Sequence, residues 1–145
     1  MSVTTSVPKG RDWLTTINSN FSKLDDLNVD HGWKETGFTA INGWTYKWGG
    51  YRTWKVGGRD FLEISMHLDA PSGGFKPQSA VDICKFPLDS GFGHIVIATG
   101  YLQNTQQGNA VGVNYDSNHR ALSLGNTTGY TINVTSGDFY VIASN

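Results

Sequence analysis

From Trp33 onward the chain consists of short segments, apolar or alternating, separated by turn residues, and this pattern restricts its fold more than any other feature. Residues 60–70 alternate apolar with polar side chains, as in a strand with one buried face. Residues 93–102 are apolar on both faces, which predicts a central strand between two sheets. We expect further strands at 44–48, 51–56, 80–84, 110–116, 121–124, 130–134 and 139–143, with turns at Gly49-Gly50 and similar pairs between them.

About nine short strands with no helix between them indicate an all-β fold rather than a parallel α/β sheet. We expect an antiparallel β-sandwich or jelly-roll-like barrel. The composition agrees, because charged residues make up only 16% of the chain and strong helix formers are scarce. A length of 145 residues suits one such domain with a short appendage.

Helical periodicity is found near the N-terminus, in residues 12–27. Leu14, Ile17, Phe21 and Leu24 follow a spacing of three, four and three, which is the seam of a short coiled coil. Because so short a helix is marginal alone, the seam needs an apolar partner. The helix either lies back on its own β region or self-associates, and we favour self-association because the β region is able to form its own core. We therefore divide the chain into a helical trimerisation or docking segment, 1–30, and a β head domain, 31–145.

Charge and motif content exclude several function classes. The net charge is −1 without a basic run, which argues against nucleic acid as a partner, and no apolar stretch is long enough for membrane insertion. The sequence contains no nucleophile elbow, no phosphate-binding loop and no pair of histidines at metal-ligand spacing. We therefore expect no enzyme activity, cofactor or metal. Cys84 lies in an apolar run and is expected to be a buried thiol. With one cysteine and a polar N-terminus, we expect synthesis in a cytoplasm.

Aromatic residues crowd between Trp33 and Trp54. Trp44, Tyr46 and Trp48 alternate there, so we expect them to share one face of a strand. Such rings either close the core or form a platform on which the apolar faces of sugar rings stack. Trp44 and Trp48 are therefore candidates for binding a saccharide.

A polar cluster covers residues 114–120. Along the preceding strand Val113 and Tyr115 face one way and Asn114 and Asp116 the other, so the polar pair lies on the open face. The cluster is either a solvated hairpin tip with an Asx-type turn, or part of a site that offers donors and acceptors to a polyol. The predicted saccharide site consists of Asn114, Asp116, His119 and Arg120, together with Trp44 or Trp48.

Short motifs dispersed over nearly the whole chain resemble phage tail proteins. Asp12-Trp13-Leu14, Ile17-Asn18, Phe21 and Leu24-Asp25 are similar to the short N-terminal helix of phage tail and baseplate proteins. The later motifs are similar to the β head domain of receptor-binding proteins and tail fibres of phages that infect Gram-positive bacteria. These motifs are Asn42-Gly43-Trp44, the segments 51–58 and 61–65, Phe86-Pro87, and the segments 110–113 and 137–140.

This resemblance implies a homotrimeric head in the virion tail that binds cell-wall polysaccharide or a teichoic-acid-like polymer during adsorption. Asn114 and Asp116 match the polar pair of such heads. The N-terminal segment would then dock onto a larger baseplate or tail protein. Two alternatives stay open: a polysaccharide depolymerase, which needs two carboxylates in one cleft, and a structural tail or head-decoration protein without a ligand. The candidate carboxylates are Glu63, Asp69, Asp82, Asp89, Asp116 and Asp138.

Overall fold

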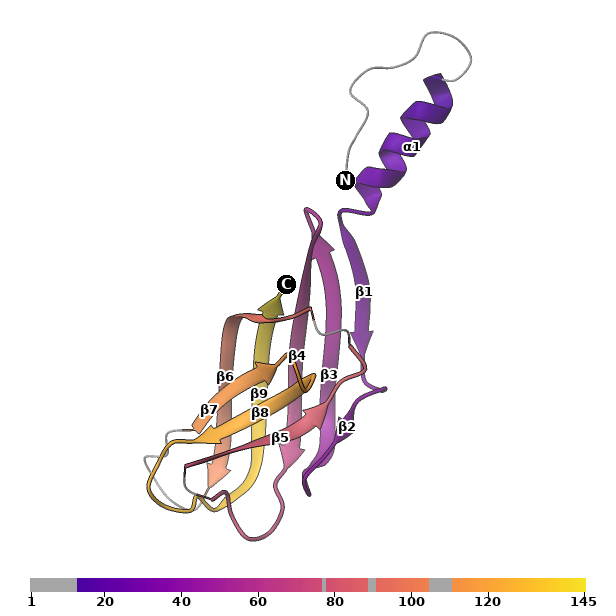
Figure 1. Ribbon diagram of the computed structural model, residues 1–145. Coiled ribbons are helices and arrows are strands. Elements are labelled where there is room, and N and C mark those ends of the chain that lie inside the picture. Colours follow the sequence, from indigo (N-terminus) through magenta and orange to yellow (C-terminus); the bar gives the residue numbers. More distant parts are fainter. Residues whose placement is uncertain (1–12, 77, 89–90, 105–110) are drawn as a thin grey trace.

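Two antiparallel sheets stack face to face in the computed structural model, which describes residues 13–76, 78–88, 91–104 and 111–145 (Figure 1). The strand order is β1-β3-β4-β9-β6 in the five-stranded sheet and β2-β5-β8-β7 in the four-stranded sheet. The elements are α1 (Trp13–Asp25), β1 (Val29–Lys34), β2 (Thr39–Ala40), β3 (Thr45–Val56), β4 (Arg59–Asp69), β5 (Ser79–Lys85), β6 (His94–Asn104), β7 (Val111–Asp116), β8 (Ala121–Asn126) and β9 (Val134–Ser144). The predicted all-β fold with a short N-terminal helix is confirmed, although the two sheets do not close into a barrel.

The core lies between the two sheets. The alternation in β4 buries Leu62, Ile64, Met66 and Leu68 as the sequence predicts, and each side chain is at most 1% exposed. Burying side chains of this size contributes about 1.5–3 kcal/mol each. Cys84 is completely buried in the same core, which confirms its predicted position.

The prediction that residues 93–102 form a central strand between the sheets is wrong. β6 is the edge strand of the five-stranded sheet and pairs with β9. The register shifts between Ile95 and Ile97, so that Val96 and Ile97 are both exposed while Ile95 packs against the core. A β-bulge of this kind breaks the two-residue alternation, and the apolar run therefore covers both faces at an edge.

Gly49 and Gly50 do not form the expected turn but lie inside β3, which joins two predicted strands into one. A Cβ atom on Gly49 would lie 2.2 Å from the carbonyl oxygen of Ser65, and one on Gly50 would lie 2.1 Å from that of Lys34. Gly49 also has a φ of 102°, which other residues rarely adopt. The two glycines therefore allow β1, β3 and β4 to approach closely.

Trp44, Tyr46 and Trp48 do not share one face, contrary to the prediction. The register shifts between Tyr46 and Trp48, so Tyr46 pairs with the inward-facing Leu68 but Trp48 pairs with the outward-facing His67. Trp44 is buried at 7% exposure, and Trp48 is 56% exposed. The bulge separates the rings into a core residue and a surface residue.

Three further segments differ from the sequence prediction. Residues 130–134 are not a regular strand, because Ile132 makes an isolated bridge to Phe75 before β9 begins at Val134. The strands β1 and β2 were not predicted. β1 is polar at most positions and exposed along nearly its whole length, so it carries no alternation of apolar residues.

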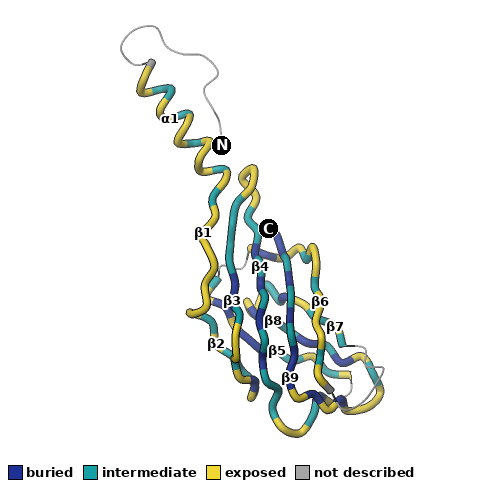
Figure 2. The backbone as a smooth tube through the Cα atoms, turned by 180° about the vertical axis from the view of Figure 1, so that it is seen from behind, coloured by how far each residue is buried: buried dark blue, intermediate teal, exposed yellow. Residues whose placement is uncertain are grey.

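The helix α1 stands beyond the end of the sandwich and does not lie back on the β region (Figures 1 and 2). Leu14, Phe21 and Leu24 are exposed, and Ile17 is half-buried. The connection after the helix is fixed to the β3–β4 hairpin, because Gly58 N–H donates to the Leu27 carbonyl over 3.0 Å. No described residue of the β region covers the apolar seam of α1.

Candidate functional site

The structure separates the predicted saccharide-binding residues. Asn114, Asp116 and His119 line a groove of about 400 Å³ on the outer face of the four-stranded sheet, which we call the Asp116 groove. Trp48 lies on the outer face of the other sheet, and Trp44 lies near one end of the core. Neither tryptophan lines the Asp116 groove, so the structure does not bring an indole to the polar cluster.

Arg120 also lies outside the lining of the Asp116 groove. It has a φ of 54°, and its carbonyl oxygen accepts a hydrogen bond of 2.9 Å from Phe86 N–H. Arg120 therefore has a structural role through its backbone, which joins the β7–β8 turn to the end of β5.

The floor of the Asp116 groove is formed by two cross-strand rows over β5, β8 and β7. Gly112 and Gly125 pair with each other beside Ala80, and these small residues leave the hollow. In the neighbouring row Asp82, Ser123 and Asn114 are in register and bring polar side chains to its edge. A groove with this lining can accept hydrogen bonds from hydroxyl groups and donate to them.

An Asx turn after β7 positions His119. Asp116 Oδ1 accepts hydrogen bonds from the N–H groups of Asn118 (2.9 Å) and His119 (3.1 Å), which confirms the predicted turn. The imidazole Nδ1 then lies 2.8 Å from Asp82 Oδ2 and 3.4 Å from Asp116 Oδ2. Ser123 Oγ donates to the second oxygen of Asp82. The polar cluster is thus held from two strands that lie far apart in the sequence.

Asp82, Asp116 and His119 together are a possible cation site. One ligand atom from each of them lies within 4.8 Å of the others. Carboxylates and an imidazole are ligand types that divalent cations accept. The sequence did not show this group, because Asp82 comes from β5 and the spacing of the histidines carries no signal for it. In the structure His119 and Asp82 are within hydrogen-bond distance and satisfy each other.

A second candidate site crosses four strands on the outer face of the five-stranded sheet. Trp48, His67, Asp138 and Tyr101 are in register on β3, β4, β9 and β6, and we call them the Trp48–Tyr101 row. The two terminal rings are 56% and 69% exposed. Because neighbouring strands lie 4.7–4.9 Å apart, the ends of the row are about 14 Å apart. Trp48, Asp138 and Tyr101 of the row line a groove of about 420 Å³, to which Ser65, Thr99 and Tyr140 also contribute.

Contacts within the row fix the rings and the carboxylate. The Trp48 indole stacks on the His67 imidazole, with ring centroids 5.5 Å apart and planes inclined by 10°. His67 Nδ1 lies 2.7 Å from Asp138 Oδ1. Holding an indole and a carboxylate in this way reduces the freedom that they would lose when a ligand binds.

Glu63 organises the polar groups beside the row. Its carboxylate accepts hydrogen bonds from Arg52 Nε (2.6 Å) and from Tyr140 Oη (3.0 Å). Burial, together with the hydrogen bond to Glu63, raises the pKa of Tyr140 above its ordinary value. Tyr140 therefore stays protonated at neutral pH and presents a neutral hydroxyl at the edge of the groove.

From the sequence, Trp48 is a candidate for saccharide binding and Asp138 is one of the candidate carboxylates, whereas His67 and Tyr101 were not predicted as site residues. His67 and Asp138 belong to strands whose outward positions are polar, which is a signal for exposure but not for proximity. Tyr101 lies in the strand 93–102, which was assigned to the interior. Only the register of β9 between β4 and β6 brings these side chains together.

Comparisons with known proteins gave no match, so a function has to be inferred from the fold and the two candidate sites. No protein-family model matches the chain, and the comparisons with curated proteins and with solved structures found no match either. Among the described residues, no helix has the length and apolar character needed to cross a membrane.

Proposed function

We propose that this chain is the head of a phage-tail receptor-binding protein, and that it binds a host cell-surface saccharide along the Trp48–Tyr101 row. The observation that carries this proposal is the row itself: two exposed rings with a carboxylate and hydroxyl groups between them. Sugar rings stack their C–H faces on aromatic side chains, and their hydroxyls donate to carboxylates.

The strength of such binding suits a multivalent adhesin. A hydrogen bond to a neutral group contributes about 0.5–1.5 kcal/mol, so one head binds a saccharide weakly. Several heads on one particle that engage a repetitive polymer raise the overall affinity by orders of magnitude. A homotrimer, joined through the exposed seam of α1 and docked onto a larger baseplate or tail protein, would provide this multivalency.

The assignment to a phage tail is supported by the sequence motifs that resemble such proteins, from the helical segment to residues 137–140. The position of α1 agrees with it, since a helix that stands clear of the sandwich can join other chains without covering either groove (Figure 1).

The experiment is a binding assay of the full chain on cell walls and teichoic acid purified from Gram-positive bacteria. Trp48→Ala and Tyr101→Ala are each expected to weaken binding about tenfold, which corresponds to about 1.4 kcal/mol. Tyr130→Ala is the control, because Tyr130 is also exposed (46%) but lies outside the row. If both row variants bind as well as the parent, the row is not the saccharide site.

A second candidate function, hydrolysis of a polysaccharide, is favoured by the Asp116 groove. Side-chain oxygens of Asp82 and Asp116 lie within 4.8 Å of each other, close to the carboxyl separation of about 5–5.5 Å in retaining glycosidases. Release of reducing ends from purified cell walls, and its loss in Asp82→Asn and Asp116→Asn, would establish this activity. For a binding head we expect no release.

A further inference from the structure

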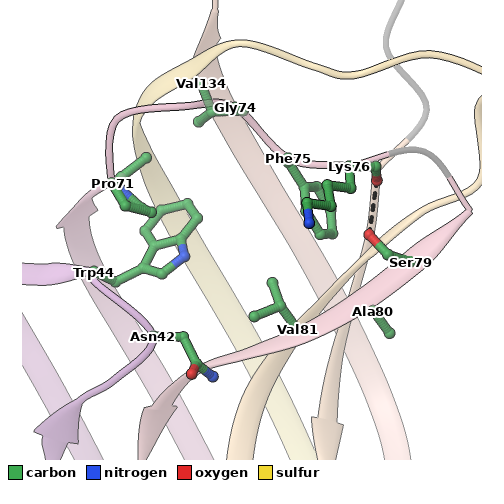
Figure 3. Close-up of a pocket in the computed structure, with 11 residues that line it drawn as sticks. Asn42, Trp44, Pro71, Gly74, Phe75, Lys76, Ser79, Ala80, Val81 and Val134 are labelled. Carbon is green, nitrogen blue, oxygen red and sulfur yellow. Dashed lines mark hydrogen bonds between the residues drawn. The ribbon is translucent and has the colours of Figure 1, made fainter.

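A third cavity lies at the end of the sandwich where Trp44 is buried (Figure 3). It shares no lining residue with the groove along the Trp48–Tyr101 row, and it adjoins the Asp116 groove at Ala80 and Val81. It has a volume of about 290 Å³, and we call it the Trp44 pocket. Most of its wall is apolar and comes from Trp44, Pro71, Phe75, Val81 and Val134. This volume is near the lower end of the range for ligand pockets, which suits a small molecule rather than an oligosaccharide.

Trp44 directs a hydrogen-bond donor into this pocket. The residue is only 7% exposed, and its indole nitrogen points toward the cavity in Figure 3. Among the described residues, none accepts a hydrogen bond from this Nε1–H. In the part of the chain that the structure describes, the fully buried side-chain atoms without a hydrogen-bond partner are Tyr115 Oη and Ser144 Oγ, so the Trp44 N–H reaches the open space of the pocket. An acceptor oxygen on a ligand in the pocket can therefore accept from it.

One ring contact and one backbone hydrogen bond position Trp44. It packs edge-on against Phe139 at a centroid distance of 6.0 Å, and its backbone N–H donates to the Ile41 carbonyl over 3.1 Å. The turn before it places Asn42 (φ 54°) and Gly43 (φ 83°) in left-handed conformations. The indole N–H is therefore a preformed donor and not a freely rotating side chain.

The remaining polar side chains of the lining include one cation. Lys76 is exposed at the rim and is the charged residue among the described lining residues. It forms no ion pair with a described carboxylate. Asn42 Nδ2 and Ser79 Oγ already donate to backbone carbonyls, those of Asp82 (2.8 Å) and Lys76 (2.7 Å). The Lys76 ammonium group and the Trp44 indole N–H are thus two donors in the lining that a ligand can use.

We propose that the Trp44 pocket binds a small monocarboxylate with a compact apolar body. The apolar body contacts the walls, and the carboxylate accepts from Trp44 Nε1–H and interacts with the Lys76 ammonium group. This site is independent of the saccharide proposed for the Trp48–Tyr101 row, because Trp48 lies on the outer face of the sheet and does not line the pocket.

Indole N–H signals in a ¹H–¹⁵N correlation spectrum of the full chain give a direct readout. The five tryptophans have five such signals, and Trp44→Phe identifies the one from Trp44 while it keeps a ring in place. Phenylacetate and phenylacetamide are the probes, since they share a shape and differ in charge. We expect phenylacetate to shift the Trp44 signal saturably, and the amide to bind at least about fivefold more weakly.

Two matched lysine variants separate a local effect from net charge. Lys76→Met should weaken phenylacetate binding about fivefold and leave the amide unaffected, whereas Lys85→Met, at the far end of β5 and outside the pocket, should change neither. Equal losses in the two variants, equal affinity for acid and amide, or no shift of the Trp44 signal would overturn the proposal.

Two further measurements keep the result interpretable. If Trp44→Phe does not fold, sequential assignment of the parent spectrum identifies the Trp44 signal instead. Trp48→Ala should bind phenylacetate as the parent does. A variant that loses saccharide binding but still binds phenylacetate is therefore affected at the Trp48–Tyr101 row. A variant that loses phenylacetate binding but still binds saccharide is affected at the Trp44 pocket.

Discussion

His67 and Asp138 lie directly opposite each other on β4 and β9, with 2.7 Å between Nδ1 and Oδ1, while the His67 ring stacks on Trp48. The carboxylate therefore holds the imidazole, and the imidazole supports the indole. This relationship links the polar centre of the proposed saccharide site to one of its aromatic ends.

Replacing Asp138 with alanine tests this link. We expect Asp138→Ala to weaken binding to cell-wall saccharide about tenfold, because a hydrogen bond to a charged group contributes about 1.5–3 kcal/mol and the support of Trp48 is also lost. The matched control is Asp69→Ala: Asp69 lies 3.8 Å from His67 Nε2 but does not line the groove. Equal losses in both variants, measured on immobilised cell walls, would speak against a specific role of Asp138.

Gly49 is expected to be essential for the stability of the sheet. Gly49→Ala would place a Cβ atom 2.2 Å from the Ser65 carbonyl oxygen and would force alanine into a φ of 102°. We expect a loss of about 3 kcal/mol or more in the free energy of unfolding, measured by denaturant titration. Gly129→Ala is the control, because a Cβ atom there meets nothing within 4 Å. Its effect should stay within about 0.5 kcal/mol.

Regular alternation allowed most of the strands to be predicted from the sequence. The pattern in β4 and the polar and apolar faces of β7 were assigned correctly, because each side chain there follows the two-residue period of a strand. The predictions failed at Trp48 and Val96, where a bulge changes that period. They also failed at Gly49, where a glycine allows neighbouring strands to approach closely and does not form a turn. Nothing local in the sequence marks these positions.

The candidate sites were predictable in part. Asn114, Asp116 and His119 lie within one hairpin, so local spacing was sufficient to group them. Asp82 joins them, and Tyr101 joins Trp48, only through strand order and register. Such long-range pairing depends on how the whole sheet assembles, which a single sequence does not specify directly.

Burial of Cys84 makes the stability of the protein sensitive to alkaline pH. Burial raises the thiol pKa from 9.0 to about 12, so the folded state keeps a proton that the unfolded state releases. The free energy of unfolding should therefore be unaffected by this group below pH 9 and should fall between pH 9 and pH 12. The slope that Cys84 contributes is at most about 1.4 kcal/mol per pH unit.

Denaturant titrations of the parent and of Cys84→Ala between pH 8 and pH 11 measure this contribution. Tyr115, whose pKa burial also raises to about 12, adds a decrease above pH 10 that both proteins share. The variant should show the shallower decrease between pH 9 and pH 10. Identical slopes there would mean that the thiol ionises in the folded state as it does in the unfolded state.

The last prediction concerns the seam of α1, where Leu14, Phe21 and Leu24 are exposed beside the half-buried Ile17. Covering each such side chain in a trimer contributes about 1.5–3 kcal/mol, and a carboxylate at the seam would oppose this. We expect light scattering to give about three times the chain mass of 15.9 kDa for the parent. Ile17→Asp should shift the mass toward a single chain without changing the β-sheet circular dichroism.

Asn18→Asp adds the same charge at an exposed position of the helix outside the seam, and it should leave the trimer intact. A parent protein that has the mass of one chain at every concentration would refute trimerisation through α1. Dissociation by both variants would show that charge, and not the apolar seam, controls the association. Because the sandwich has its own core, the monomeric variant should still bind the saccharide, only with the weaker affinity of one head.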